Sequence, residues 1–109
     1  MRLVSANLCQ ELFEKYSHGV TWTDNFIIFN DENKSVGALA IDTNCGNAEI
    51  KMLCIDNEDE NRGIFISVLN YLKSRYSSVK IKCSYKSPLS TLCIEEGFKE
   101  VERVYKYTK

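Results

Sequence analysis

The sequence has few of the residues on which metal sites and disulfide frameworks depend. Among its 109 residues there is one histidine, His18, and one proline. A single histidine argues against a zinc site built on several imidazoles and against a Ser-His-Asp triad. The five cysteines are odd in number and widely spaced, and no two of them form a Cys-x-x-Cys pair. They predict small buried side chains in a reducing compartment, not a disulfide framework or a metal site.

Long hydrophobic runs and an excess of charge of one sign are absent as well. No apolar run approaches the roughly 20 residues of a membrane span, and the first residues lack the apolar segment of a secretory signal. The net charge is -1, whereas nucleic-acid-binding domains usually carry a clearly basic face. We therefore expect a cytoplasmic protein without a membrane or nucleic-acid partner. With 44% hydrophobic residues, residues 1–109 predict a single domain around one core.

The residues from Ala48 to Lys73 predict a strand, a short acidic turn and a helix. The segment from Ala48 to Ile55 begins with alternation and ends in an apolar run, which is typical of a strand that becomes covered on both faces. Asn61 is the predicted N-cap of the helix. A strand that leads through a short turn into a helix directs free backbone N–H groups toward a ligand beyond the strand end. The helix has one apolar stripe, formed by Ile64, Phe65, Val68, Leu69 and Leu72.

The N-terminal residues predict a short first strand over residues 1–4 and then an amphipathic helix. Ser5 or Asn7 is the predicted cap of this helix, and Gly19 is predicted to end it. The apolar face of the helix consists of Leu8, Leu12, Phe13 and Tyr16.

The rest of the chain predicts a mixed sheet between two layers of helices, an α+β fold in an α/β/α arrangement. The helix between the predicted strands at 48–55 and 79–85 predicts a right-handed parallel crossover. The predicted strands at 22–30, 35–42 and 48–55 form an antiparallel meander. Ser87 with Pro88 predicts the start of a short helix that Gly97 ends. Small residues at positions 37, 38 and 40 predict that a helix packs closely on their strand. The predicted strands are residues 22–30, 35–42, 48–55, 79–85 and 98–108.

This order of elements and two local motifs resemble the GNAT superfamily of acyl-CoA-dependent N-acyltransferases. The strand from Ala48 to Ile55 and the turn after it are similar to the central strand and pyrophosphate loop of the family, written R/Q-x-x-G-x-G/A. In this sequence the loop motif runs from Glu60 to Phe65, with Gly63 at its first glycine. The segment from Glu95 to Phe98 is similar to the end of the family's Y-E-K-L-G-F signature. The resemblance covers the chain from about residue 22 onward.

The resemblance implies that acetyl-CoA is the co-substrate and that an amine, on a small molecule or a protein, attacks its thioester directly. The pantetheine would lie where the central strand and the next parallel strand separate, near Ile55 and Cys83-Ser84. Loop N–H groups would hold the pyrophosphate, and an N–H near Leu53 would stabilise the developing oxyanion. The implied cofactor-binding residues are Leu53, Cys54, Ile55, Glu60, Asn61, Arg62, Gly63, Ile64, Phe65 and Ser87.

The resemblance also implies two catalytic positions. Glu49 falls where the histone-acetylating branch carries its catalytic base, although it also fits a solvent-facing strand glutamate. Cys93 falls where the family usually has the tyrosine that acts as general acid, although it also fits a packed core cysteine. Tyr85 and Tyr105 are alternatives for the acid.

Departures from the family pattern support a second hypothesis, a GNAT-like binding or regulatory module that has lost CoA binding. Glu60 replaces a basic or amide residue, and the ring of Phe65 replaces a residue that lets the backbone approach phosphate. The carboxylates at positions 56, 58, 59 and 60 would repel a pyrophosphate and favour a cationic acceptor such as a polyamine, an aminoglycoside or a lysine side chain, and only Arg62 opposes them.

The resemblance further predicts that the chain ends about where the family's final strand would begin. An exposed last strand would then be free to pair with a partner or to form a homodimer. A third hypothesis, an α+β domain unrelated to this family, would lack parallel pairing between the strands at 48–55 and 79–85.

Overall fold

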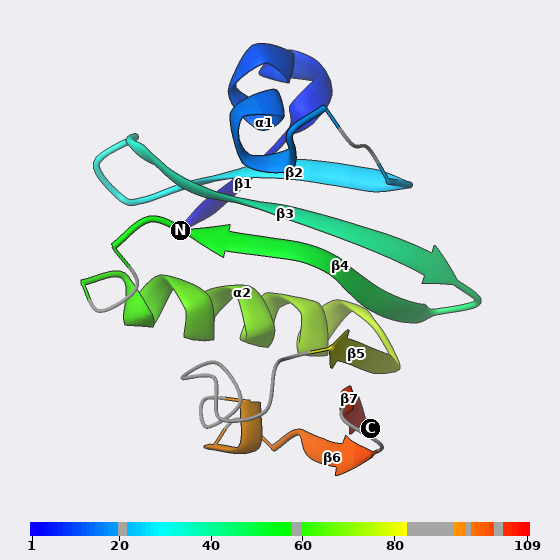
Figure 1. The fold of residues 1–109 in the computed structure, drawn as a ribbon. Coiled ribbons are helices and arrows are strands. Elements are labelled where there is room, and N and C mark those ends of the chain that lie inside the picture. The colour runs from blue at the N-terminus through cyan, green and yellow to red at the C-terminus, as the bar shows by residue number, and fades with distance from the viewer. Residues whose placement is uncertain (20–21, 58–59, 83–92, 96, 102–103) are drawn as a thin grey trace.

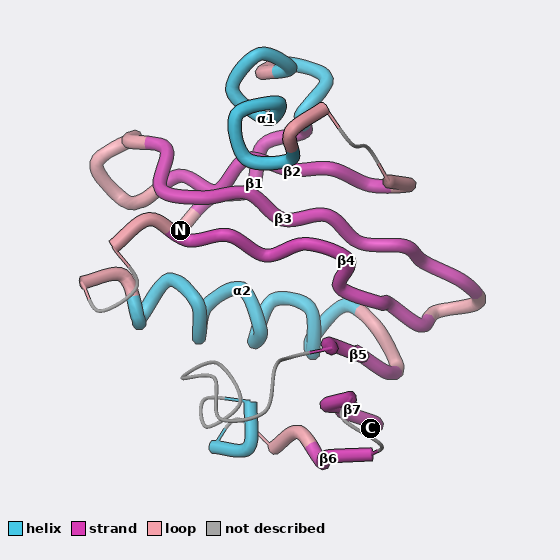
Figure 2. Tube along the Cα trace, viewed as in Figure 1, coloured by secondary structure: helices cyan, strands magenta, loops and turns pink. Residues whose placement is uncertain are grey.

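A computed structural model describes residues 1–19, 22–57, 60–82, 93–95, 97–101 and 104–109. The described residues form one seven-stranded sheet in the order β1-β2-β3-β4-β5-β7-β6 (Figure 1). Figure 2 shows the two helices α1 and α2 on separate parts of this sheet. The elements are β1 (Arg2–Ser5), the 3-10 turn η1 (Ala6–Leu8), α1 (Gln10–Ser17), β2 (Asp24–Phe29), β3 (Ser35–Asn44), β4 (Asn47–Ile55), α2 (Arg62–Arg75), β5 (Ser78–Lys82), β6 (Lys99–Val101) and β7 (Val104–Thr108).

The strand directions confirm the predicted meander and crossover. Strands β1 to β4 pair antiparallel in chain order, and β4 pairs parallel with β5 after the chain has passed through α2. The β3–β4 hairpin turns through Cys45 and Gly46, whose φ angles are 50° and 81°. Two positive φ angles are the requirement of a type I′ turn, which matches the twist of the flanking strands. The parallel β4–β5 pair excludes the hypothesis of an unrelated fold without this crossover.

Helices cover both faces of the sheet, as predicted. Helix α1 packs Phe13 against Ala38 and Ala40 of β3, so the small residues do lie under a helix. Gly37 is small for another reason, because a Cβ at this position would collide with the carbonyl of Cys54 on β4. Helix α2 covers the other face, where it packs with Leu39, Ile41, Ile50, Val79, Ile81 and Tyr105.

A bulge in β4 changes which face its side chains occupy. The register passes from Ile41↔Ile50 to Ala40↔Met52, so Lys51 has no partner on β3. Ile50 and Leu53, three residues apart, both pack on the α2 side, and Met52 packs on the α1 side. A bulge adds one residue to a strand, bends it and increases its twist.

The first helix differs from its prediction. The chain forms the short turn η1 and then α1, with Cys9 between them at φ -140°. Ser5, not Asn7, caps η1, since its hydroxyl accepts a hydrogen bond from the Asn7 N–H at 3.4 Å. The break at Cys9 rotates Leu8 away from the apolar face, and Leu8 is 79% exposed. The assignment of Leu8 to the buried face was therefore wrong.

The C-terminal strand prediction was also wrong. Within residues 98–108 the structure describes two strands, β6 and β7, which pair antiparallel from Lys99↔Lys106 to Val101↔Val104. Strand β7 returns between β6 and β5 and pairs antiparallel with β5 from Ser78↔Thr108 to Lys82↔Val104. The chain therefore does supply this strand, contrary to the expectation that it ends before it.

The short helix before β6 ends as predicted. Gly97 has a φ of 89°, and the Phe98 N–H donates to the Cys93 carbonyl at 2.9 Å while the Gly97 N–H donates to the Ile94 carbonyl at 3.1 Å. These two bonds are the Schellman pattern with Gly97 at C′. Its predicted start, Ser87-Pro88, lies outside the described residues.

Within the described part of the chain, no helix is both long enough and apolar enough to cross a membrane.

Candidate functional site

The second half of β4 runs beyond its pairing with β5. The parallel register extends from Asn47↔Ser78 to Ile50↔Ile81, whereas β4 continues to Ile55. Among the described residues, the strand partner of residues 52–55 is β3 alone. The described part of β5 ends at Lys82 and does not pair with this half of β4. This is the place predicted for the pantetheine; Cys83 and Ser84 lie outside the described residues.

The first turn of α2 lies beyond this half of β4. The Ile64 and Phe65 N–H groups donate to the Asn61 carbonyl at 2.9 and 3.3 Å. The N–H groups of Arg62 and Gly63 have no hydrogen-bond acceptor among the described residues, and they lie at the positive end of the helix dipole. A Cβ on Gly63 would meet no heavy atom within 4 Å. The turn is therefore open to an approaching anion at Gly63.

Asn61 stands at the predicted N-cap position without capping. Its side chain makes no cap hydrogen bond, and its amide Nδ2 donates instead to the carbonyl of Asp56. This bond ties the end of β4 to the start of α2.

Phe65 does not obstruct the loop. It is 2% exposed and belongs to the core between α2 and the sheet, together with Val68, Leu69 and Leu72. The expectation that its ring would prevent the backbone from approaching a phosphate is therefore wrong. The apolar stripe of the helix gave the better indication, because position 65 lies on the same helical face as 68, 69 and 72.

The acidic residues near this turn remain exposed. Asp56 and Glu60 are on the surface, while residues 58 and 59 lie outside the described residues. The Arg62 guanidinium lies 3.2 Å from the carboxylate of Glu95, and both side chains are more than half exposed, at 58% and 54%. Exposed ion pairs contribute only about 0 to 1 kcal/mol, so this contact leaves Arg62 able to exchange Glu95 for a phosphate.

Glu49 lies on β4 near the end of the described pairing with β5. It is one residue before the last β4–β5 pair, opposite Asp42 on β3 and Lys80 on β5. Its carboxylate lies 3.1 Å from the Lys51 ammonium, and its side chain is 44% exposed. A half-exposed carboxylate at this position can reach an incoming amine directly or through one water. The role of Glu49 as a base stays a prediction.

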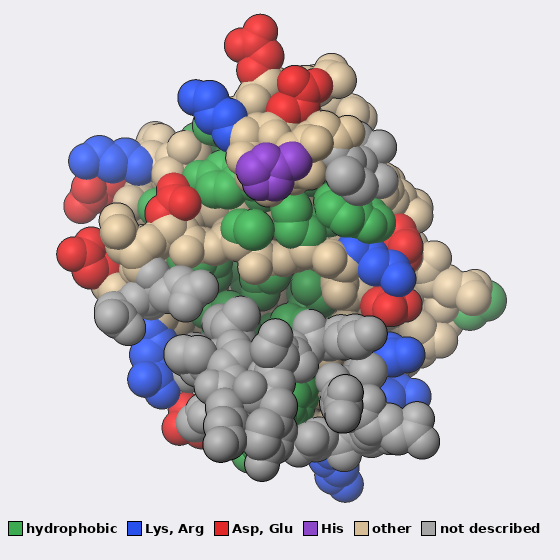
Figure 3. All heavy atoms as spheres, in the orientation of Figure 1, with side chains coloured by type: hydrophobic (Ala, Val, Ile, Leu, Met, Phe, Trp, Pro, Cys, Tyr) green, Lys and Arg blue, Asp and Glu red, His purple; other side chains and the backbone are tan. Residues whose placement is uncertain are grey.

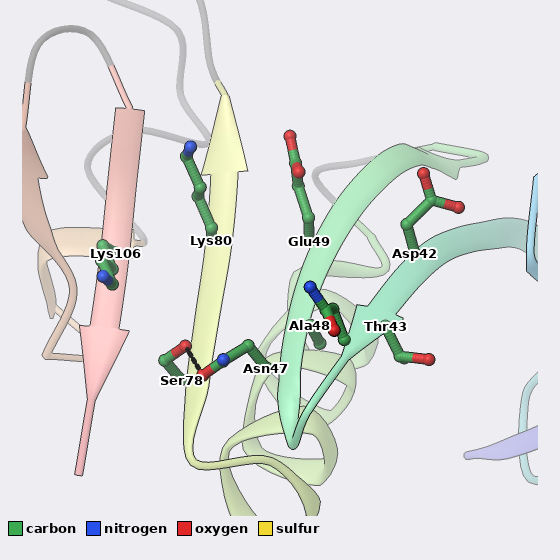
Figure 4. A pocket seen from close by; sticks show the side chains of 9 residues that line it. Asp42, Thr43, Asn47, Ala48, Glu49, Ser78, Lys80 and Lys106 are labelled. Atoms are coloured by element: carbon green, nitrogen blue, oxygen red, sulfur yellow. Dashed lines mark hydrogen bonds between the residues drawn. The ribbon is translucent and has the colours of Figure 1, made fainter.

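A cavity of about 300 Å³ lies next to Glu49 on the face of the sheet opposite α2 (Figure 4). Its floor is fixed by the hydrogen bond that the Ser78 hydroxyl donates to the Asn47 side-chain oxygen at 2.6 Å. The sequence analysis singled out only Glu49 among the lining residues. Its walls and rim are formed by Asp42, Thr43, Asn44, Asn47, Ala48, Glu49, Ser78, Lys80 and Lys106.

A row of charged side chains crosses this cavity from strand to strand. Asp42 pairs with Glu49, Glu49 with Lys80, and Lys80 with Lys106. We call these four residues the charge row. Figure 3 shows acidic and basic side chains following one another over the right-hand ends of β3, β4 and β5. Only the register between distant strands brings the row together, which is why local patterns did not predict it.

The acidic end of the charge row is held by Thr23. The Thr23 hydroxyl and N–H donate to Asp42 Oδ1 at 2.7 and 3.1 Å. These bonds, the hydroxyl first, lower the pKa of Asp42, with a smaller contribution from the charge of Lys51. Asp42 is therefore a fixed carboxylate at neutral pH.

Tyr16 lies at the other end of β4, where the sequence indicated only a core residue. Its hydroxyl donates to the Asp56 carboxylate at 2.8 Å. Burial, followed by this hydrogen bond and the charge of Asp56, raises the pKa of Tyr16 to about 12. The bond joins α1 to the strand end beside the candidate pyrophosphate turn.

The remaining predicted residues divide between core and surface. Cys93 is 0% exposed and Tyr105 4%, both in the core on the α2 side, which favours the packing interpretation over an acid role. Leu53, Cys54 and Ile55 are partly buried along β4, and Ser87 lies outside the described residues. No group of three or more metal-ligating side chains occurs within the described ranges.

Solved structures that match this fold include N-acetyltransferases and an acetyltransferase of the GNAT family. The ribosomal-protein-S18-alanine N-acetyltransferase of Escherichia coli matches 98% of this chain and 92% of its own, with a TM-score of 0.65 and 11% identity. Mutant forms of the spermidine/spermine N-acetyltransferase of Vibrio cholerae match 94% of this chain and 75% of their own, with a TM-score of 0.59 and 16% identity.

A GNAT-family acetyltransferase of Staphylococcus aureus gives a TM-score of 0.60 at 13% identity, and this chain spans 66% of its length. The sequence matches no protein-family model, and a search of curated proteins finds no match. The chain therefore has the GNAT fold, as the resemblance predicted, and the comparison is one of fold.

Proposed function

We propose that the protein is an N-acetyltransferase that transfers the acetyl group of acetyl-CoA to an amine by direct attack on the thioester. The observation that carries this proposal is the course of β4. Its second half, which the described part of β5 does not pair with, leads to the open first turn of α2 at Gly63. A CoA molecule needs an extended backbone for its pantetheine and a helix N-terminus for its pyrophosphate, in this order.

The residues present fit acetyl-CoA mainly through the backbone. Leu53, Cys54 and Ile55 would face the pantetheine along β4, and the N–H groups of Arg62 and Gly63 would face the pyrophosphate. The exposed Arg62 side chain would leave Glu95 for the phosphates, which bear more negative charge than one carboxylate. The carboxylates of Asp56 and Glu60 weaken the site, and salt should reduce this penalty because both are exposed.

The proposed reaction needs one base and one oxyanion donor. The amine nitrogen attacks the thioester carbonyl carbon, the N–C bond forms, and the C–S bond breaks to release the CoA thiolate. An N–H of β4 near Leu53 would stabilise the oxygen as it becomes negative. Glu49 would take the proton that the amine loses, directly or through a water, and the released thiolate is protonated from solvent.

A second candidate is a GNAT-fold binding module without CoA affinity. The Arg62–Glu95 ion pair and the exposed carboxylates of Asp56 and Glu60 favour it, since they leave the turn without an unpaired cation among the described residues. The two candidates differ in one measurable quantity, the affinity for acetyl-CoA.

Calorimetric titration with acetyl-CoA distinguishes them, with two variants that place a carboxylate at opposite ends of α2. Gly63→Glu is sterically free and suits the helix dipole, so it should fold while repelling the pyrophosphate. We expect micromolar binding by the wild type, an affinity at least about ten-fold lower for Gly63→Glu, and no change for Ser74→Glu. Absence of binding by the wild type at millimolar acetyl-CoA would refute the transferase and leave the module.

Glu49→Gln tests the catalytic assignment separately. It should keep the affinity for acetyl-CoA and lower the rate of CoA release with an amine by about 10²- to 10⁴-fold. An unchanged rate would return Glu49 to the role of a solvent-facing strand residue.

A further inference from the structure

We propose that the acceptor is a small zwitterion: an amine that carries a carboxylate or a phosphate a few atoms away, with the anionic group held by Lys80 and Lys106. This inference rests on the proposed function, because it assigns the acceptor of the same site. It comes from the charge row and from the cavity that the row crosses.

The charge row stands on the face opposite α2. On each of its four strands a neighbouring residue is buried in the core beneath α2, namely Ile41 on β3, Ile50 on β4, Ile81 on β5 and Tyr105 on β7. Because side chains alternate along a strand, Glu49, Lys80 and Lys106 point to the other face. In Figure 4, α2 lies behind the strands, and Glu49 and Lys80 extend side by side in the same direction.

The acidic and the basic side chains of the charge row differ in whether they already have polar partners. The carboxylate of Glu49 lies 3.1 Å from the Lys51 ammonium, and Asp42 is held by Thr23. Within the described ranges, by contrast, neither Lys80 nor Lys106 forms an ion pair. Among the described residues, the row therefore has lysines without an ion-pair partner at the β5–β7 end, beside the carboxylate that would receive the amine.

The lysines also stand directly opposite one another. Lys80 pairs with Lys106, and Lys106 pairs on its other side with Lys99 of β6. Like charges at directly opposed positions destabilise a sheet. An anion between Lys80 and Lys106 would remove this repulsion, so the arrangement favours binding of a carboxylate or phosphate over an empty surface.

The strand spacing sets the size of the acceptor. Adjacent strands lie about 4.8 Å apart, so an amine at Glu49 and an anion at Lys80 and Lys106 would be separated by roughly 5 to 10 Å. An ω-amino acid such as β-alanine, or an aminoalkyl phosphate, reaches the short end of this range, and the cavity of about 300 Å³ is large enough for either.

The same geometry disfavours a polyamine. A second ammonium group of a polyamine bound at Glu49 would approach Lys80 one strand away. The acidic residues that suggested a cationic acceptor, Asp56 and Glu60, follow the opposite end of β4 from this cavity. Their charge acts on the candidate cofactor turn and not on the acceptor.

The inference is tested with matched amines that differ only in the anionic group. The pairs are ethanolamine phosphate with ethanolamine, and β-alanine with β-alanine amide, and spermidine is added as a polycation. Release of CoA is followed for the wild type, Lys80→Gln and Lys106→Gln. Lys34→Gln, in the β2–β3 turn and 76% exposed, is the control for loss of one lysine. Binding of each amine without acetyl-CoA is followed in parallel by backbone amide NMR shifts.

We expect the anionic member of a pair to have the lower KM, and each row variant to raise that KM about ten-fold while leaving the neutral member unchanged. A preference shared by both pairs assigns anionic amines in general, and a preference in one pair alone assigns phosphate or carboxylate. Equal KM values within both pairs, preference for spermidine, or equal effects of Lys34→Gln would overturn the inference.

The binding measurement separates this inference from the proposed function. In one outcome no amine releases CoA, but ethanolamine phosphate or β-alanine still shifts the amide signals of β5 and β7, and Lys80→Gln abolishes these shifts. The transferase proposal then fails and the anion site stands. If CoA is released and these shifts do not depend on Lys80 or Lys106, the transferase stands and the zwitterion is refuted.

Discussion

Replacing Phe65 should unfold the protein more readily and should not open a cofactor site. Sequence comparison alone favours the opposite outcome, because position 65 is glycine or alanine in the loop motif that this chain resembles. In the structure the ring is 2% exposed and packs among Val68, Leu69 and Leu72 between α2 and the sheet. The variants Phe65→Ala and Phe65→Leu therefore test the position of the ring directly.

The expected magnitude follows from core truncation. A buried Phe→Ala replacement costs about 3 to 5 kcal/mol of unfolding free energy, since it removes the apolar contacts and leaves a cavity. Domains of this size have only about 5 to 15 kcal/mol in total. At roughly 4 to 8 °C per kcal/mol, the melting temperature should fall by at least about 12 °C. Phe65→Leu keeps most of the volume and should cost about 1 to 1.5 kcal/mol.

Urea unfolding followed by tryptophan fluorescence measures these values. The chain has one tryptophan, Trp22, which packs against the core on the α1 side and so reports on global unfolding. Acetyl-CoA titrations of the folded variants at low temperature complete the test. A Phe65→Ala variant within about 0.5 kcal/mol of the wild type, with higher acetyl-CoA affinity, would place the ring over the loop and refute the reasoning.

Three further predictions concern single contacts. Burial and Asp56 raise the pKa of Tyr16 to about 12, so the folded phenol stays protonated at a pH at which the unfolded phenol ionises. Stability should therefore fall as pH rises from about 10 to 12. Tyr16→Phe should flatten this slope in urea titrations. Thr23→Ala should raise the lowered pKa of Asp42 toward 3.8, as measured by carboxyl NMR, and an unchanged pKa would contradict the Thr23 assignment. Asp42 stabilises the wild type above its unfolded pKa, and this contribution is lost as pH falls through the folded value. Gly97→Ala, at φ 89°, should cost about 1 kcal/mol in thermal unfolding, whereas Gly63→Ala, outside the positive-φ region, should not destabilise.

The strand-turn-helix unit could be predicted because its signals are local. The stripe that includes Phe65 and Leu69 repeats at helical spacing, and the observed α2 runs from Arg62 to Arg75. Gly97 stands where the short helix needs a positive φ, which glycine adopts without strain. Each of these signals depends only on residues within one or two helical turns, so the local sequence is sufficient to predict it.

The missed elements depend on features that leave no local signal. Between β6 and β7 the sequence has none of the Gly, Asn or Pro residues that mark most turns. The break at Cys9 interrupts a periodicity that reads as continuous and leaves Leu8 exposed. The charge row needs the register of four strands at once, which alternation along any one strand does not determine.

The bulge at Lys51 connects the sheet to the proposed chemistry. It falls directly after Ile50, the last residue of β4 that pairs with β5, and a bulge bends a strand and increases its twist at that point. The first part of β4, which pairs with β3 and with the described part of β5, places Glu49 beside Lys80. The second part pairs with β3 and leads toward Gly63 at the start of α2. The proposed acceptor cavity and the candidate cofactor turn therefore lie toward opposite ends of the same strand, and an amine and a thioester would meet between them.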